Sequence, residues 1–106
     1  MPAISSADDL TAALAAVDNL RIVEISWVTA NAELTALVRD AGLQAQQDVM
    51  ADGDGLAALD GDYTGWKTYV EAGVQLLQTS FPELLVPAVR QYNRTGVFPE
   101  HGPGAL

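Results

Sequence analysis

The residues best suited to chemistry form a run of twelve, residues 60–71, with the sequence DGDYTGWKTYVE. In helix–loop–helix calcium sites, ligand oxygens come from loop positions 1, 3, 5, 7, 9 and 12, and glycine at position 6 allows a sharp turn. Gly65 occupies position 6 here, and position 7 would contribute the Trp66 carbonyl. The pattern therefore predicts a candidate calcium site, whose side-chain ligands would be Asp60, Asp62, Thr64, Thr68 and Glu71.

Two positions in this run depart from the calcium pattern. Thr64 stands at position 5, where an acidic or amide side chain is usual, and Lys67 at position 8 brings a cation close to the ion. Asp-Gly pairs also form turns, and Asp or Thr side chains commonly cap the first turn of a helix. We favour this second interpretation, in which Asp62 or Thr64 caps a helix, and we keep calcium as the one cofactor considered.

The residue types give little support for catalysis. The chain has no cysteine, and its single histidine, His101, lies near the C-terminus. A thiolate zinc site and a cysteine nucleophile are thereby excluded, and a histidine-dependent triad finds no suitable base. Glu24 lies near Trp27, and a buried glutamate there would have a raised pKa, as active-site acids often do. The simpler interpretation places Glu24 at the edge of the apolar stripe, where it reaches water or pairs with Arg21. We predict a protein that is not an enzyme and has no catalytic residues.

The charge balance limits the partners. Fourteen acidic residues against five basic ones give a formal net charge of −9. Nucleic acids and anionic membrane surfaces would repel such a chain, whereas a basic protein would be attracted. The N-terminal sequence MPAISSADDL has neither the basic flank nor the apolar stretch of a signal peptide, and no apolar run approaches the ~20 residues of a membrane span. We expect a cytoplasmic protein or one inside a particle.

The spacing of apolar residues predicts an all-α fold, a small compact bundle of four to five helices. A first helix begins at a Ser6 cap and carries an apolar stripe of Leu10, Leu14 and Val17. Further helices are predicted over residues 65–78 and, after a capping box with proline in its first turn, from residue 80 to Gly96.

Residues 20–41 are harder to assign. Residues 20–29 are rich in β-branched side chains, as a buried strand would be. Spacings of three and four residues nevertheless predict one long helix, with a stripe made of Leu20, Val23, Trp27, Ala30, Leu34, Leu37 and Ala41. We predict helix and keep strand as the alternative for residues 20–29.

Two segments are expected to be irregular. Residues 51–64 are rich in Asp and Gly and predict a long loop, where a metal or an interaction would be expected. Residues 97–106 contain two prolines and two glycines and predict an extended C-terminal tail, which is either disordered or docked on a neighbouring subunit. The chain is therefore divided into one helical domain, residues 1–96, and a tail, residues 97–106.

Three functions follow from these features. The favoured one is a non-catalytic assembly or adaptor subunit of a larger complex, such as a virion or another particle, with protein partners and a homo-oligomer as its natural form. The alternatives are a calcium-binding helical module and an acidic inhibitor or immunity-type protein that masks a basic partner. The interface residues predicted for assembly are Ile22, Ile25, Val28, Phe98 and Leu106.

Overall fold

The protein has an α/β fold, and the predicted all-α bundle is wrong. The computed structural model describes residues 1–26 and 29–102, without the side chains of residues 51 and 52. Four parallel strands form one sheet in the order β1-β2-β3-β4, the same as their order in the sequence. The strands are β1 (Ala3–Ile4), β2 (Ile22–Ile25), β3 (Gln44–Asp48) and β4 (Leu76–Gln78).

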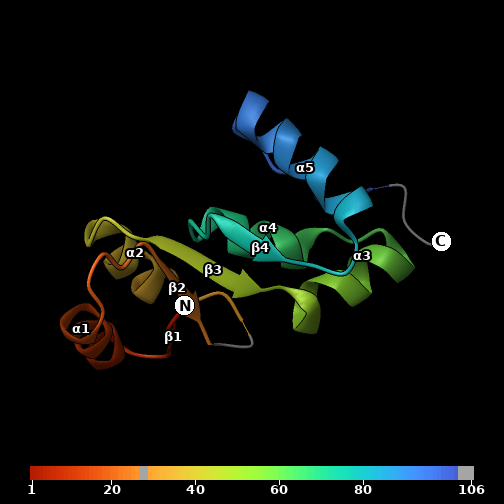
Figure 1. The fold of residues 1–106 in the computed structure, drawn as a ribbon. Helices are drawn as coiled ribbons and strands as arrows, with labels where there is room; N and C mark the ends of the chain where they lie inside the picture. The colour runs from red at the N-terminus through yellow and green to blue at the C-terminus, as the bar shows by residue number, and fades with distance from the viewer. Residues whose placement is uncertain (27–28, 103–106) are drawn as a thin grey trace.

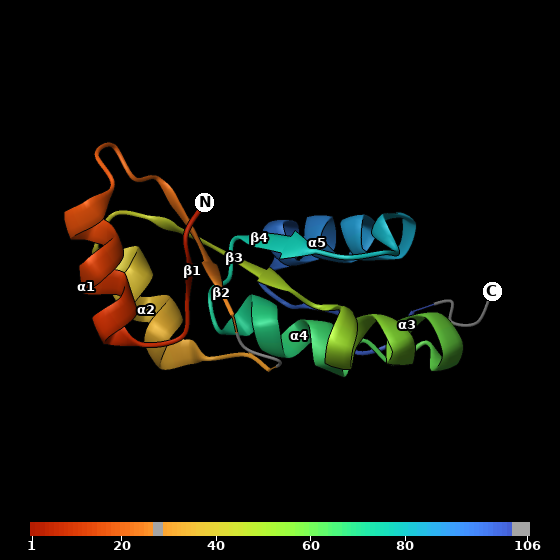
Figure 2. The same cartoon turned by 60° about the horizontal axis from the view of Figure 1, so that its bottom comes forward.

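Helices connect the strands and follow the last one. They are α1 (Ala7–Ala16), α2 (Ala32–Asp40), the π-helix η1 (Met50–Asp54), α3 (Gly55–Asp60), α4 (Thr64–Glu71) and α5 (Pro82–Thr95). In both views α1 and α2 lie at one end of the molecule, whereas α5 lies beside β4 at the other (Figures 1 and 2). The molecule measures 44 × 26 × 20 Å. Its radius of gyration, 14.3 Å, exceeds the ~13 Å typical of a compact chain of this length.

Over the described residues, the long helix predicted for residues 20–41 is instead the strand β2 and the shorter helix α2, and Trp27 of its stripe lies outside the described residues. Ile22, Val23 and Ile25 lie in β2, and the helix begins only after Asn31, whose side chain accepts a hydrogen bond from the Leu34 amide at 3.0 Å. The described residues of the apolar stripe belong to different elements of the fold, so their helical spacing is a coincidence. The β-branched composition was the correct signal, since such side chains pack well on a pleated surface.

Two further strands were also missed. Residues 44–48 read QAQQD and contain no large apolar side chain, yet they form β3, which pairs with strands on both sides. Residues 76–78 were assigned to the helix over residues 65–78, but Gly73 adopts a φ of +95° and α4 stops before it. The expected irregular loop over residues 51–64 is largely helical, because η1 and α3 run through it.

The core consists of two clusters that lie along the length of the sheet. The N-terminal cluster joins the first three strands to α1 and α2 through Ile4, Leu10, Val23, Ile25, Leu34, Val38, Leu43 and Ala45. The C-terminal cluster joins α3, α4, α5 and the tail through Val49, Ala57, Tyr63, Trp66, Tyr69, Val70, Val74, Leu85, Ala88 and Phe98. Both clusters place the connecting helices on the same face of the sheet.

A buried carboxylate ties together three segments of the C-terminal half. Asp54, at the end of η1, is only 3% exposed. Its Oδ1 accepts hydrogen bonds from Trp66 Nε1 at 2.8 Å and from Thr79 Oγ1 at 2.6 Å. Its Oδ2 accepts one from the Ser80 backbone amide at 2.7 Å. A buried carboxylate is costly unless donors satisfy it, and here three donors fix η1 against α4 and the start of the α5 connection.

Replacing this carboxylate by an amide should destabilise the fold. In Asp54→Asn one oxygen becomes an NH2 donor that faces another donor, so we expect the free energy of unfolding to fall by about 1–3 kcal/mol. Urea denaturation followed by Trp66 fluorescence measures this change. Asp60→Asn is the matched control, because Asp60 is exposed at the end of α3. Equal unfolding midpoints for the two variants would contradict the role assigned to Asp54.

Two neighbouring glycines should respond in opposite ways to alanine. A Cβ on Gly53 would overlap Trp66 Cδ1, so Gly53→Ala should push the indole away from Asp54 and destabilise the fold by about 1–3 kcal/mol. Gly55 begins α3 with helical φ and ψ, and a Cβ there meets no atom within 4 Å. Gly55→Ala should therefore stabilise by about 0.4–1 kcal/mol. Thermal unfolding of both variants tests the pair, and the same sign of change in both would refute this packing argument.

Candidate functional site: the uncovered face of the sheet

One face of the sheet carries no helix. Side chains on successive strand residues point to opposite faces, and here burial alternates with them. Val23, Ile25 and Ala45 are at most 1% exposed and face the helices, whereas Glu24 and Gln46 on the other face are partly exposed. In Figure 1, β3 and β4 lie in front of α4, so the viewer looks onto this side of the sheet. Parallel sheets are normally covered on both faces, which makes this arrangement unusual.

The register of the strands sets the side chains of this face in rows. Ala3, Glu24, Gln46 and Leu76 form one row across all four strands, because each is paired with the next. Ile22 pairs with Gln44, and Asp48 pairs with Gln78. We call this set the uncovered face; it consists of Ala3, Ile22, Glu24, Gln44, Gln46, Asp48, Leu76 and Gln78.

The uncovered face is polar and acidic. It contains two carboxylates, Glu24 and Asp48, together with three glutamine amides, and none of its eight residues is basic. The Gln46 and Gln78 side chains are joined by a 3.3 Å hydrogen bond from Nε2 to Oε1, which orders the amides on β3 and β4. Asp48 Oδ1 accepts from the Met50 amide at 2.7 Å, so this carboxylate is also fixed. The carboxylates of such a surface can accept hydrogen bonds from cationic side chains, and its glutamine amides can both donate and accept hydrogen bonds.

The predicted interface residues lie in different places. Ile22 is half-buried on the uncovered face, whereas Ile25 faces the helices and is 1% exposed. Phe98 is also 1% exposed, within the C-terminal core of its own chain, rather than held out for a neighbouring subunit. Val28 and Leu106 lie outside the described residues.

The predicted calcium ligands are not brought together. Asp60 ends α3, and Asp62 precedes α4, whereas Glu71 is the last residue of α4. Positions 5 to 12 of the calcium pattern thus lie in α4, which rises by roughly 10 Å over its eight residues, and not in a loop that could wrap around an ion. Across residues 1–26 and 29–102, no three His, Asp or Glu side chains are placed so that they could hold a metal.

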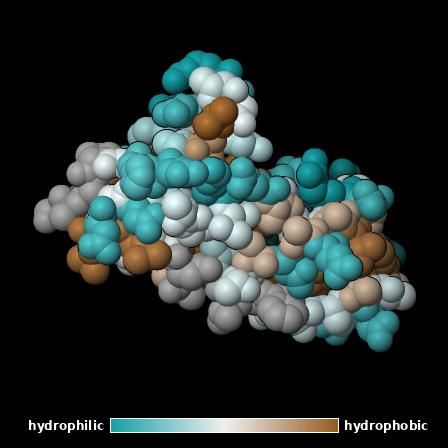
Figure 3. Space-filling model, turned by 180° about the vertical axis from the view of Figure 1, so that it is seen from behind, coloured by the Kyte–Doolittle hydropathy of each residue, from teal (hydrophilic) through white to brown (hydrophobic). Residues whose placement is uncertain are grey.

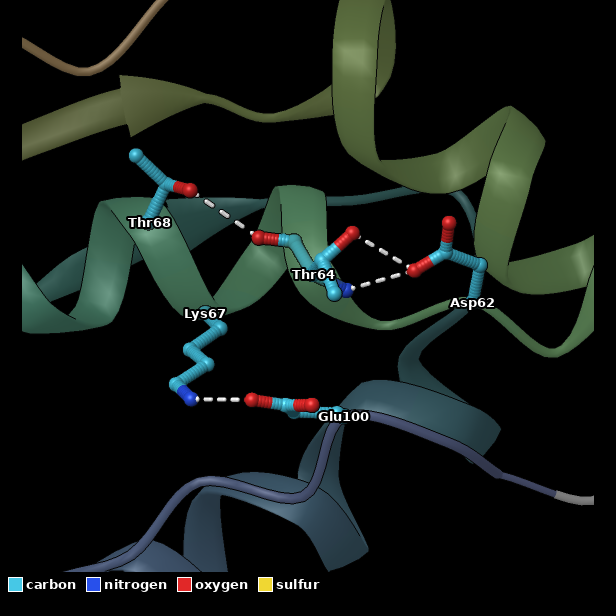
Figure 4. A network of polar contacts seen from close by, with 5 residues as sticks. All are labelled: Asp62, Thr64, Lys67, Thr68 and Glu100. Carbon is cyan, nitrogen blue, oxygen red and sulfur yellow. Dashed lines mark hydrogen bonds and ion pairs between the residues drawn. The ribbon is translucent and has the colours of Figure 1, made fainter.

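Asp62 forms a turn before α4 instead, and the predicted cap by Asp62 or Thr64 is wrong, because Tyr63 is the N-cap of α4 and no side chain caps this helix. Its Oδ1 accepts hydrogen bonds from the Thr64 hydroxyl at 2.6 Å and from the Thr64 amide at 2.9 Å (Figure 4). These two bonds lower the pKa of the Asp62 carboxyl below its usual value, the hydroxyl contributing most. The cation at Lys67 is paired as well, because its Nζ lies 2.6 Å from Glu100 Oε1. That contact lowers the pKa of Glu100 and raises the pKa of Lys67.

The beginning of the C-terminal tail docks on its own chain. The Tyr63 amide donates to the Glu100 carbonyl at 2.8 Å, and the Gly102 amide donates to the Gly61 carbonyl at 3.0 Å. Asp62 and His101 form an antiparallel bridge between them. Residues 100–102 thus pair with the turn that joins α3 to α4, and the lone histidine lies beside that turn.

Comparison with known proteins adds no relatives. No family model, curated protein or solved structure matches this chain. The geometry described above therefore carries the functional argument. None of the described helices combines the length and the apolar character needed to cross a membrane.

Sequence reasoning missed most of the uncovered face. Only Ile22 was predicted as an interface residue there, while Gln44, Gln46 and Gln78 drew no attention because amides are not reactive. A signal was nevertheless present in residues 44–46, where polar, small and polar side chains alternate as they do on a strand with one buried face. The buried Gln47 hid this pattern; its Nε2 donates to the Thr29 carbonyl at 2.7 Å.

The hydrogen bond from the Thr64 hydroxyl to Asp62 leads to a prediction about the pKa of Asp62. Removing the hydroxyl in Thr64→Ala should move the Asp62 pKa upward toward its usual value, while Thr68→Ala, whose hydroxyl donates to the Thr64 carbonyl instead, should leave it unchanged. Carbon-13 NMR of the carboxyl groups through an acid titration measures both.

The lowered pKa of Asp62 also makes the stability of the folded chain depend on pH. A pKa lowered on folding stabilises the native state above the pKa of the unfolded chain, and this contribution disappears as the pH falls through the folded value. The difference in stability between the parent protein and Thr64→Ala should therefore narrow in acid. An Asp62 pKa that is the same in both proteins would refute the hydrogen bond between the Thr64 hydroxyl and Asp62.

Proposed function

We propose that this chain is a non-catalytic protein-binding subunit of a larger assembly, and that a partner with a basic surface docks on the uncovered face. The observation that supports the proposal is a parallel sheet with one face left without helices. Because parallel sheets are usually covered on both sides, a second protein is the natural cover for this one. The polar character of the face suits a partner that associates with an already folded chain.

Charge selects the kind of partner. The uncovered face contains Glu24 and Asp48 and no basic residue, and the whole chain has a net charge of −9. Two copies of this chain meeting through that face would bring carboxylates together, which is unfavourable. A different protein bearing lysine or arginine would pair with these carboxylates and with the glutamine amides. An inhibitor or immunity-type protein that masks a basic partner is one form of this function.

The test is charge reversal on the uncovered face. Partners captured from an extract of the source cells would be purified, and their affinities for two variants compared across a range of salt concentrations. Glu24→Lys should weaken binding by at least about tenfold, because a central contact becomes repulsive. Glu71→Lys is the matched control, since it makes the same change of charge at an exposed position on α4. The control should bind nearly as well as the parent protein.

Further measurements decide the outcome. Hydrogen exchange of the complex should show protection over residues 44–48 and 76–78, and affinity should fall steeply with salt. Equal losses for Glu24→Lys and Glu71→Lys would overturn the proposal. So would sedimentation showing that the captured partner is a second copy of this chain bound through the same face.

A further inference from the structure

A groove between α4, β4 and α5 provides a second binding surface. It has a volume of about 630 Å³, within the roughly 300–1,000 Å³ typical of small-molecule sites. Its apolar wall includes Val70 and Val74 from the α4 side, Leu77 from β4, and Leu85 and Val89 from α5. From behind, α5 forms the projection at the top of the molecule, and apolar residues elsewhere on this side occur in separate groups (Figure 3).

The charge of the groove is opposite to that of the rest of the chain. Two of its fifteen lining residues are arginines, Arg39 and Arg90, and none is acidic. The whole chain has fourteen acidic and five basic residues, so a lining of this size without a carboxylate is unexpected. Among residues 1–26 and 29–102 the one ion pair joins Lys67 to Glu100, so neither arginine of the groove is in an ion pair there.

The position of Arg39 depends on a glycine. Gly73 follows α4 with a φ of +95°, and a Cβ at this position would lie 2.8 Å from Arg39 Nη1. The missing side chain therefore allows the guanidinium to lie against the end of α4, at the margin of the groove. Arg39 comes from α2 and Arg90 from α5, so the two cations approach the groove from different elements.

We propose that this groove binds a small carboxylic acid with an apolar body. The guanidinium groups of Arg39 and Arg90 would pair with the carboxylate, since planar guanidinium donors match the geometry of a carboxylate. The apolar body would lie on the valine and leucine wall, where exposed side chains such as Leu76 and Val86 gain burial. A strongly hydrated anion such as free phosphate would leave that wall exposed to water. This inference does not rest on the protein-binding proposal, because Leu76 is the one residue that the groove shares with the uncovered face.

The test uses three eight-carbon probes that differ only in their head group: octanoate, octan-1-ol and octylammonium. Nitrogen-15 NMR titration of the full chain should show saturable shifts for octanoate, confined to Arg39 and to residues 70–79 and 82–93. Octan-1-ol and octylammonium should bind at least about tenfold more weakly, because only the carboxylate can pair with the arginines.

Variants of the four arginines provide a matched comparison. Arg39→Gln with Arg90→Gln should weaken octanoate binding by at least about tenfold. Arg21→Gln with Arg94→Gln removes the same charge from residues outside the groove lining and should leave binding unchanged. Dispersed amide spectra confirm folding of each variant. Equal affinities for octanoate and octan-1-ol, equal losses in the two double variants, or no saturable octanoate shifts would each overturn the proposal.

Discussion

The fold of the C-terminal half depends on satisfying one buried carboxylate. Among the described residues Asp54 forms no ion pair, and it relies on three donors, contributed by the Trp66 indole, the Thr79 hydroxyl and the Ser80 amide. These donors come from α4 and from the connection between β4 and α5, so the same contact fixes the indole, the end of β4 and the start of α5. The glycine before Asp54 is part of this constraint, because the indole lies where its side chain would be. Both proposed binding surfaces include β4, and both therefore depend on this contact for their shape.

The two surfaces differ in the charge and polarity of their side chains. The uncovered face presents carboxylates and amides, while the groove beside α5 presents two arginines over an apolar wall. Both arise from the same architecture, since a single layer of helices covers one side of the sheet and leaves the other side open. The last helix then adds a wall beside the edge strand without covering that open side. A protein partner and a small carboxylic acid would thus contact different residues, apart from Leu76, which belongs to both surfaces.

The sequence predicted local features better than the arrangement of the chain. Two local features were assigned correctly, since Ser6 caps the first helix and Gly96 ends α5. Parallel strands have no local partner, and each pairing here joins segments separated by about 20 or 30 residues. Neither the short β1 nor the polar β3 has a composition that identifies it as a strand. The groove could not be predicted either, because Arg39 and Arg90 are distant in sequence and line the same groove only in the folded chain.

The identity between strand order and chain order has a consequence for how the molecule opens. Each strand pairs only with those before and after it in the sequence, as repeats do in a solenoid, so stability is transmitted between neighbours along one direction. The two core clusters follow one another along this direction. The strand β3 contributes Ala45 to the first cluster and is followed directly by Val49 of the second. If either end opens while the other stays folded, β3 remains paired on one side, so we expect its amides to exchange most slowly with solvent.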